Sequence, residues 1–508
     1  EMKKNKHLII AVCVLLCVML LTACGGGDGK ATASATPAPT GSAEASATGG
    51  TNSGSLLPPR GDNLQNAIKA GETYRYFCWA VKDENDPYSF EPTVVQENLP
   101  KKRAELEEQY GITIKYIIND AQDWAAKVME ASLAGTPITD ILHGGGPFAM
   151  LNIYNFSSTG GRLLLQLDEY SDYADFSDPS WWRTELQQSG YFNGHQYFAV
   201  PNVIGIEHVA LNQVCIFNKS LLESAGYPAD KLYEMNQSGE WTWDKFEEIA
   251  VACTDLDNDT YGIHIGENNF LMWNLTASNN AAILSEVQDA DTGKTYYQFS
   301  GDSANALEAW DFFLKLGRQN LMFSQCWDFE DVKFREGKVA LMTTYVNRAN
   351  KMVAEGSYPE YGIIMVPKGP RADDYVSSRN WFVPYCVFKN TSNPAGSVQV
   401  LSEYCVPRYA ASSEENMASF ELDATSVSCD EQSVEVLKQL KSKTITEPFI
   451  VYWNTPTFDV DGNQLCLANL YLTYNEAFID GSMTPAVFFA SVKDVLNNTL
   501  KDAQNVLS

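Results

Sequence analysis

The order of apolar and polar positions after residue 72 predicts alternating strands and helices. Apolar runs at 73–81, 112–118 and 138–142 predict buried strands. Between these runs, residues 99–110 and 123–131 carry apolar side chains at helical spacing and predict amphipathic helices. Strand, helix and strand in this succession are typical of a parallel sheet with helices on its faces. The pattern therefore indicates an α/β fold.

Five single residues sharpen this outline. Gly135 and Gly226 follow helical patterns and are expected to end their helices, because glycine accepts the left-handed backbone at a helix end. Trp310 lies among apolar residues at helical spacing and is interpreted as a core side chain. Trp241 and Trp243 are expected to pack at the start of the helix that follows them.

The beginning of the chain has a different pattern. Three lysines precede an apolar run at 8–21, which is shorter than the ~18–20 residues that span a bilayer and has the layout of a secretory signal. The run closes with Leu21-Thr22-Ala23-Cys24, which resembles a bacterial lipobox. That resemblance implies removal of residues 1–23 and acylation of Cys24. An uncleaved anchor helix is the alternative. Either way, we expect the body on the outer face of the bacterial cell membrane.

Residues 24–71 are rich in Gly, Ala, Ser, Thr and Pro and contain almost no large apolar side chain before Leu56. Such a segment buries too little surface to offset its chain entropy, so it predicts a flexible linker between the lipid and the body.

Composition and charge narrow the function. The chain is 45% hydrophobic and 12% aromatic, which suffices for two packed lobes in the roughly 440 residues after the linker. Its net charge of −28 argues against a basic groove for nucleic acid. Eight cysteines follow Cys24, and none forms a CxxC pair, so no zinc site is expected. Disulfides stay open, because an extracellular location permits them.

Eight short segments support a family resemblance. They are 134–141, 161–170, 191–201, 217–226, 241–246, 261–263, 334–342 and 362–367. In this order, and behind a lipobox, the chain resembles the bacterial extracellular solute-binding lipoproteins of ABC importers, in particular the carbohydrate-binding branch of the family 1 type.

The resemblance implies a two-lobed, periplasmic-binding-protein-like fold of type II, with a ligand cleft between lobes that are joined by hinge strands. We expect crossings between the lobes near 203–211 and 379–387. The expected division is signal peptide 1–23, linker 24–71, first lobe 72–206 plus 381–445, and second lobe 207–380 plus 446–508.

A sugar site needs flat aromatic platforms and polar partners for hydroxyl groups. The best platform is Trp381, beside Asn380 at the second crossing. The resemblance also places at the cleft the loops after Leu142, Gly266 and Met342. These loops nominate Gly144, Trp273, Asn274, Tyr345 and Asn347, with Trp79 and Trp327 behind them. A packing role is the alternative for each.

Two catalytic or metal-binding patterns fail on inspection. Residues 143–146 and 301–305 look like the oxyanion loop and nucleophile elbow of an esterase, but all five histidines precede Ser303, so no base follows it. Residues 255–259 space three aspartates as a calcium loop would, yet Thr260 stands where such a loop needs Gly. We interpret 255–259 as a solvated turn, with calcium left open.

The expected function is that of a non-enzymatic substrate-binding subunit. It would capture an oligosaccharide, without a cofactor, and deliver it to a membrane permease by lobe closure. A Walker sequence is absent, so the ATPase would be a separate partner. We expect a monomer. An extracellular carbohydrate-active enzyme, a sensory or adhesive binding module, and a peptide or other solute remain alternatives.

Overall fold

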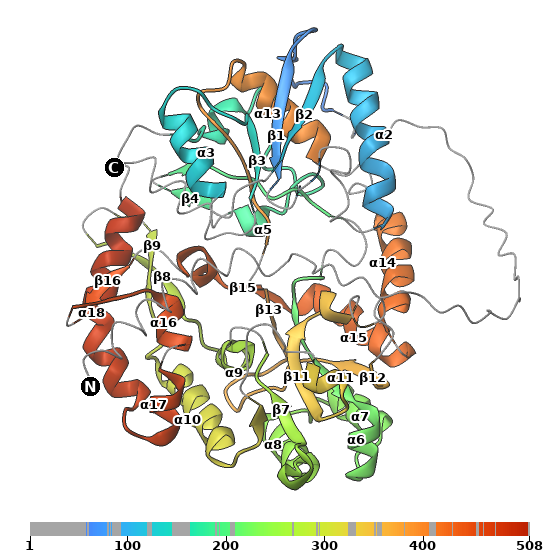
Figure 1. The fold of residues 1–508 in the computed structure, drawn as a ribbon, viewed down its shortest axis with the longest axis vertical. Helices are drawn as coiled ribbons and strands as arrows, with labels where there is room; N and C mark the ends of the chain where they lie inside the picture. Colours follow the sequence, from blue (N-terminus) through green and yellow to red (C-terminus); the bar gives the residue numbers. More distant parts are fainter. Residues whose placement is uncertain are drawn as a thin grey trace, which may run out of the picture.

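The structure is a computed structural model that forms two lobes, one above the other in Figure 1. It describes residues 57, 60–78, 81, 83, 93–118, 124–144, 163–187, 190–192, 194–203, 209–266, 269–290, 293, 295–323, 332–349, 352, 358–379, 382–405, 413–428, 430–453, 457–460, 462–472 and 474–505. The signal peptide, Cys24, Trp79, Trp327, Asn380 and Trp381 lie outside these residues.

Lobe one is built on a four-stranded sheet in the order β14-β3-β1-β2. Its strands are β1 (Thr73–Cys78), β2 (Thr113–Ile117), β3 (Ile141–His143) and β14 (Tyr385–Val387). The first three are parallel, and β14 runs antiparallel to β3. The lobe also holds α2 (Thr93–Tyr110), α3 (Trp124–Leu133), η1 (Leu167–Tyr170), α5 (Thr184–Gln187), β4 (Tyr191–Phe192), β5 (His195–Gln196) and α13 (Pro394–Cys405). The predicted strand–helix–strand order is confirmed here.

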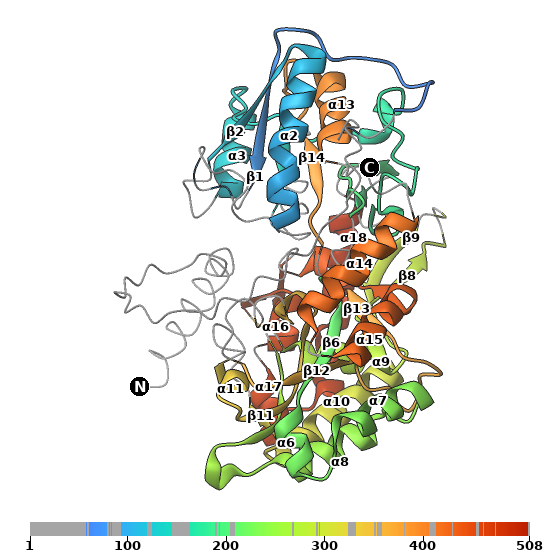
Figure 2. The same cartoon turned by 90° about the vertical axis from the view of Figure 1, so that its right-hand side faces the viewer.

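Lobe two is built on a five-stranded sheet in the order β10-β7-β11-β6-β12. Its strands are β6 (Gln213–Asn218), β7 (Tyr261–His264), β10 (Met322–Phe323), β11 (Val339–Tyr345) and β12 (Tyr361–Ile364). Every residue of β6 is buried, because β6 lies between β11 and β12 and is covered by helices. Figure 2 shows the same arrangement from the side.

The helices and short elements of lobe two surround this sheet. They are α6 (Lys219–Ser224), α7 (Ala229–Ser238), α8 (Trp243–Cys253), η4 (Leu256–Asn258), α9 (Phe270–Ser278), β8 (Leu284–Gln288), β9 (Thr295–Phe299), α10 (Ala304–Arg318) and α11 (Val332–Arg335). From the C-terminal part come η7 (Pro448–Tyr452), β16 (Phe458–Val460), β17 (Asn463–Leu465), α16 (Leu467–Leu472), α17 (Asn475–Asp480) and α18 (Pro485–Asn505).

The single-residue predictions for the core and the helix ends are confirmed. Trp241, Trp243 and Trp310 are buried in the larger hydrophobic core. Gly135 and Gly226 have φ values of +74° and +86°, where a side chain would strain the backbone.

The chain crosses between the lobes at the two expected places. Pro201 still bridges to Trp182 in lobe one, whereas β6 already belongs to lobe two. Later, β13 (Ser377–Arg379) packs against β6 and α9, and the next strand, β14, is in lobe one. A third connection follows α13, since β15 (Thr444–Thr446) pairs with β13.

The division of the C-terminal half differs from the expected one. Residues 381–445 were assigned to lobe one as a block, but α15 (Glu431–Lys443) packs against β12 of lobe two, and α14 (Ser413–Val427) packs on α15. The reason is specific contact: Ser433 Oγ accepts the Ile363 N–H at 2.9 Å, and Lys219 pairs with Asp430 at 2.7 Å.

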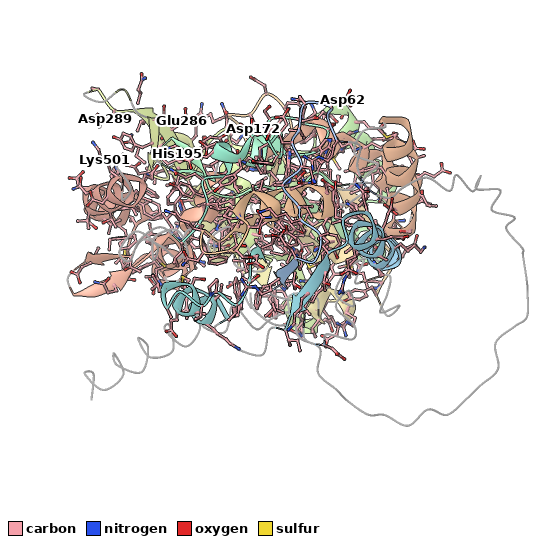
Figure 3. The ribbon with its side chains drawn as sticks, turned by 90° about the horizontal axis from the view of Figure 1, so that it is seen from above. Asp62, Asp172, His195, Glu286, Asp289 and Lys501 are labelled. Atoms are coloured by element: carbon pink, nitrogen blue, oxygen red, sulfur yellow. The ribbon has the colours of Figure 1, made fainter. Side chains whose placement is uncertain are left out.

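The end of the expected linker also belongs to the body. Arg60 pairs with buried Glu403 at 2.6 Å, and the Ala67 N–H donates to Gln399 Oε1 at 2.7 Å. Ile68 is buried in the core of lobe one. The Gln65 N–H donates to the backbone carbonyl of Asp172 at 2.8 Å. Asp62, from this segment, and Asp172 lie along one edge of the molecule in Figure 3. The prediction of a free linker to residue 71 is therefore wrong for residues 60–71.

The described cysteines are free thiols, and most are buried; they are Cys78, Cys215, Cys253, Cys386, Cys405 and Cys466. Within the described residues, none of the helices is both long and apolar enough to cross a membrane.

Candidate functional site

Three segments meet where the lobes join. At the end of β11, Val346 donates its N–H to Asn212 O at 3.0 Å and Asn347 donates to Ala210 O at 2.9 Å, so β11 continues along the first crossing. Asn212 in turn forms an antiparallel bridge with Arg379 at the second crossing. We call this place the junction, defined by Ala210, Asn212, Val346, Asn347 and Arg379.

Five aromatic rings gather beside the junction in lobe two. Tyr345, the last residue of β11, meets Phe270 with ring centroids 4.7 Å apart, and Phe270 lies 5.4 Å from Trp273. Trp273 meets Phe449 at 5.0 Å and Trp453 at 4.6 Å, both edge to face. We call these five residues the aromatic cluster. It combines β11, α9 and the chain around η7.

Buried polar atoms without hydrogen-bond partners occur in and near the segments that form this cluster. In the part of the chain that the structure describes, they are Asn269 Oδ1, Trp273 Nε1, Asn274 Oδ1, Glu447 Oε2 and Tyr471 OH. Each unmatched atom costs roughly 1–3 kcal/mol of desolvation, and buried polar groups in native proteins are nearly always paired. Three of the five belong to α9 or to the residue before it, and the other two belong to Glu447 and to Tyr471 of α16.

Glu447 connects this polar set to the junction. It follows β15 directly, and its N–H donates to Arg379 O at 3.2 Å. Its residue is only 4% exposed, and burial raises the pKa of its carboxyl to about 8. At neutral pH the carboxyl therefore keeps its proton and offers both a donor and acceptors.

Tyr471 lies near Glu447. Burial raises the pKa of the Tyr471 hydroxyl, and the neighbouring charge of Glu447 adds to the rise. Asn269 Nδ2 donates to Tyr471 O at 3.3 Å, which ties the start of α9 to α16. A Cβ at Gly301 would come within 2.5 Å of the Tyr471 hydroxyl, so this glycine makes room for it.

The structure brings some of the nominated residues together. Trp273 and Tyr345 share the aromatic cluster, and Asn274 next to them donates to Gln213 Oε1 at 3.2 Å. Asn347 is exposed at the junction. Gly144 lies in the other lobe, at the end of β3, where its N–H donates to Pro384 O at 3.2 Å. Trp79, Trp327, Asn380 and Trp381 are outside the described residues.

Sequence reasoning missed the polar set from the C-terminal segment. Glu447 is one of 64 acidic residues, so its type alone carries no signal. A usable signal was its position: it is a single acid inside the apolar run 444–453, which also supplies Phe449 and Trp453 to the cluster. Apolar neighbours on both sides favour burial of this stretch, and a buried acid is unusual enough to mark the position.

The two rejected patterns have other roles. His143 ends β3 in lobe one, where its ring stacks on Tyr385 at 4.3 Å and burial lowers its pKa to about 3. Ser303 precedes α10 in lobe two. Asp259 pairs with Lys333. Among the described residues, no group of three or more His, Cys, Asp or Glu side chains is placed to hold a metal ion.

Comparison with known proteins supports the architecture. The profile of a family described as bacterial extracellular solute-binding protein matches residues 101–420. No curated protein sequence matches the chain.

Several solved structures are similar over 85% of this chain. An ABC substrate-binding protein from Listeria monocytogenes, in complex with cycloalternan, is 16% identical, is covered over 99% of its length and has a TM-score of 0.55. The sugar-binding protein MalE from Xanthomonas citri is 15% identical, is covered over 98% and has a TM-score of 0.54. A cyclic alpha-maltosyl-1,6-maltose binding protein from Arthrobacter globiformis is 15% identical, is covered over 99% and has a TM-score of 0.54. At these identities the likeness shows the two-lobed fold.

Proposed function

The chain belongs to the bacterial extracellular solute-binding proteins, and from this membership we propose that it is the substrate-binding subunit of an ABC importer whose solute is an oligosaccharide. The proposal includes a lipid anchor at Cys24 and delivery to a permease with a separate ATPase. It also includes the absence of catalysis, which agrees with the binding-protein names of the similar structures.

The set of unpaired polar atoms beside the aromatic cluster carries the proposal. A sugar presents hydroxyl groups, which donate and accept hydrogen bonds, and C–H faces, which pack on aromatic rings. The indole N–H of Trp273, the hydroxyl of Tyr471 and the protonated carboxyl of Glu447 can donate. The amide oxygens of Asn269 and Asn274 can accept. A sugar would therefore remove the desolvation cost of several buried groups at once.

The junction would couple ligand binding to lobe closure. Glu447 stands directly after β15 and is bonded to Arg379 of β13, so a ligand held by Glu447 touches the segments that connect the lobes. Binding would favour the arrangement in which both lobes contact the sugar, and the permease would recognise that arrangement.

Calorimetry on the full-length chain in detergent tests the proposal. The ligands are neutral and acidic oligosaccharides, with amino acids and peptides as negative controls. Chromatography then checks that each sugar is recovered intact. We expect micromolar or tighter binding of one sugar family without turnover. Binding of peptides alone, or cleavage of the sugar, would contradict the proposal.

The variant Tyr471→Phe separates ligand contact from packing. It removes only a buried hydroxyl that has no hydrogen-bond partner among the described residues. The ligand-free protein should therefore keep its stability or gain up to about 1 kcal/mol, while sugar affinity falls several-fold. Tyr361→Phe is the matched control, because the Tyr361 hydroxyl donates to Val427 O at 2.7 Å. The control should lose stability and keep its affinity.

A further inference from the structure

Two buried arginines lie next to each other where lobe one meets the second crossing. Arg183 precedes α5 of lobe one and is 6% exposed, and Arg379 ends β13 and is 2% exposed. One carboxylate oxygen serves both: Glu185 Oε1 accepts from Arg183 Nε at 3.1 Å and lies 3.5 Å from Arg379 Nη1. The three side chains form what we call the arginine pair with its carboxylate.

Only one of the two nitrogens on the binding edge of the Arg183 guanidinium has a partner among the described residues. Its Nε and Nη2 lie on the same edge of the planar group, the edge that can hold a carboxylate by two parallel hydrogen bonds. Glu185 reaches Nε. Nη2 is buried and has no partner in the part of the chain that the structure describes. Nη2 is therefore an unused hydrogen-bond donor on this edge.

The electrostatics of the pair favour an added anion. Burial lowers the pKa of Arg183, and burial together with repulsion from Arg183 lowers the pKa of Arg379 to about 9. Both shifts mean that the two cations are poorly solvated, and the shift of Arg379 also reflects repulsion from Arg183. The Glu185 side chain is 52% exposed, so water screens its compensating charge.

The backbone of Arg379 links the pair to the polar set in lobe two. Arg379 O accepts the N–H of Glu447 at 3.2 Å, so the chain segments that carry these two residues lie side by side. The Glu447 carboxyl is protonated at neutral pH and does not repel an anion there. The whole chain carries a net charge of −28, so any attraction for an anionic solute must come from a local cationic site such as this one.

We propose that the arginine pair binds an anionic group, a carboxylate or a sulfate, carried by the solute. This inference rests on the proposed function, since it takes the solute to be a saccharide, and it makes that saccharide an acidic one. The anionic group would complete the binding edge of Arg183, and the sugar ring would extend toward the aromatic cluster.

Calorimetry on the full-length chain in detergent tests this assignment with three probes: a trigalacturonate, a neutral trisaccharide and sodium sulfate. We expect the trigalacturonate to bind at least 10-fold more tightly than the neutral trisaccharide. Arg183→Gln should weaken trigalacturonate binding by 10-fold or more and change neutral binding less than 3-fold. The control Arg371→Gln removes an exposed arginine paired with Glu308 and should change neither.

Glu185→Gln provides a second variant with the opposite sign. Removing the exposed carboxylate frees Arg183 Nε for the solute, so trigalacturonate binding should tighten several-fold. If Glu185 only holds the arginines in place, binding weakens instead, and the inference is wrong. Because the Glu185 side chain is half exposed, this variant is expected to fold even if Arg183→Gln does not.

The outcomes separate this inference from the proposed function. Two results would contradict an anionic solute: tighter binding of the neutral trisaccharide than of trigalacturonate, or an equal loss of affinity for both in Arg183→Gln. Either result would still be consistent with a sugar-binding protein. A different result would be that sulfate stabilises the protein through Arg183 while no saccharide binds. The anion would then not come from a saccharide, and the proposed function would be wrong.

Discussion

Arg379 Nε donates to Asn212 Oδ1 at 3.1 Å, and the two residues also face each other in an antiparallel bridge. Asn212 belongs to the first crossing between the lobes and Arg379 to the second. The amide of Asn212 also donates to Thr444 Oγ1 of β15, which follows the third connection. All three connections are thus joined at one buried asparagine, and lobe movement is expected to centre on it.

Replacing this asparagine should loosen the hinge. Asn212→Ala leaves the partners on Arg379 and Thr444 unpaired in a buried place, so the free energy of unfolding should fall by about 1–3 kcal/mol. Chemical denaturation measures the loss. Asn258→Ala, at an exposed asparagine of η4, is the control and should change stability by less than about 0.5 kcal/mol. Equal effects of the two variants would mean that Asn212 does not hold the crossings together.

The raised pKa of Glu447 predicts a specific pH dependence. The carboxyl titrates near 4.5 in the unfolded chain and at about 8 in the folded protein, so the folded state binds more protons between these values. Its contribution to stability is therefore full below pH 4.5 and is lost as the pH rises through 8. At 1.36 kcal/mol per pH unit, the loss is at most about 5 kcal/mol.

Glu447→Gln should remove this decline. Melting curves of the variant and the wild type should agree near pH 5 and separate by pH 9, with the variant more stable. Glu308→Gln is the control, since the hydrogen bond from Arg371 lowers the pKa of Glu308. That substitution should not stabilise the protein at any pH. The quantity to compare is the difference in melting temperature between the variant and the wild type. If this difference is the same at pH 9 as at pH 5, Glu447 is solvated in the folded protein.

The Arg60–Glu403 pair predicts that residues 60–71 stabilise lobe one. Glu403 is buried and also accepts from Gln399 at 2.7 Å and Tyr110 at 3.1 Å. Arg60→Ala removes the arginine that compensates the charge of Glu403. We therefore expect the free energy of unfolding to fall by about 2 kcal/mol or more.

A matched exposed pair gives the control for Arg60. Arg103→Ala breaks a helix-surface pair with Glu107 at 3.1 Å and should cost less than about 1 kcal/mol. Similar losses in the two variants would place residues 60–71 outside the folded body.

The lipobox resemblance predicts where the protein is found in the cell. Cys24→Ala removes the thiol that the resemblance predicts to be acylated, so most of the protein should move from the membrane fraction to the medium. Fractionation followed by immunoblotting measures the shift, and Cys78→Ala, at a buried core cysteine, is the control. A Cys24→Ala protein that stays in the membrane fraction would favour the uncleaved anchor helix.

Local patterns predicted the features that depend on neighbouring residues. The order of strands and helices in lobe one, the core positions of Trp241 and Trp310, and the helix ends at Gly135 and Gly226 all follow from apolar spacing or backbone conformation. Trp273 and Tyr345 also came together, because the loops that follow parallel strands meet at one edge of a sheet.

Features that depend on distant contacts were not visible in the sequence. Arg60 meets Glu403 across 343 positions, and residues 60–71 have the composition of a linker. The helix α15 is assigned to lobe two by contacts with Lys219 and Ile363, which no local pattern reveals. Glu447 gains its altered pKa only through burial, and in the sequence only its position inside the apolar run 444–453 distinguishes it from the other acidic residues.

Small-angle X-ray scattering of the full-length chain in detergent, with and without the tightest-binding oligosaccharide, tests whether sugar binding closes the lobes. We expect that the sugar reduces the radius of gyration, that the reduction saturates with the calorimetric affinity, and that the sugar is recovered unchanged. An unaltered scattering curve at saturating sugar, or recovery of cleaved sugar, would contradict capture by lobe closure.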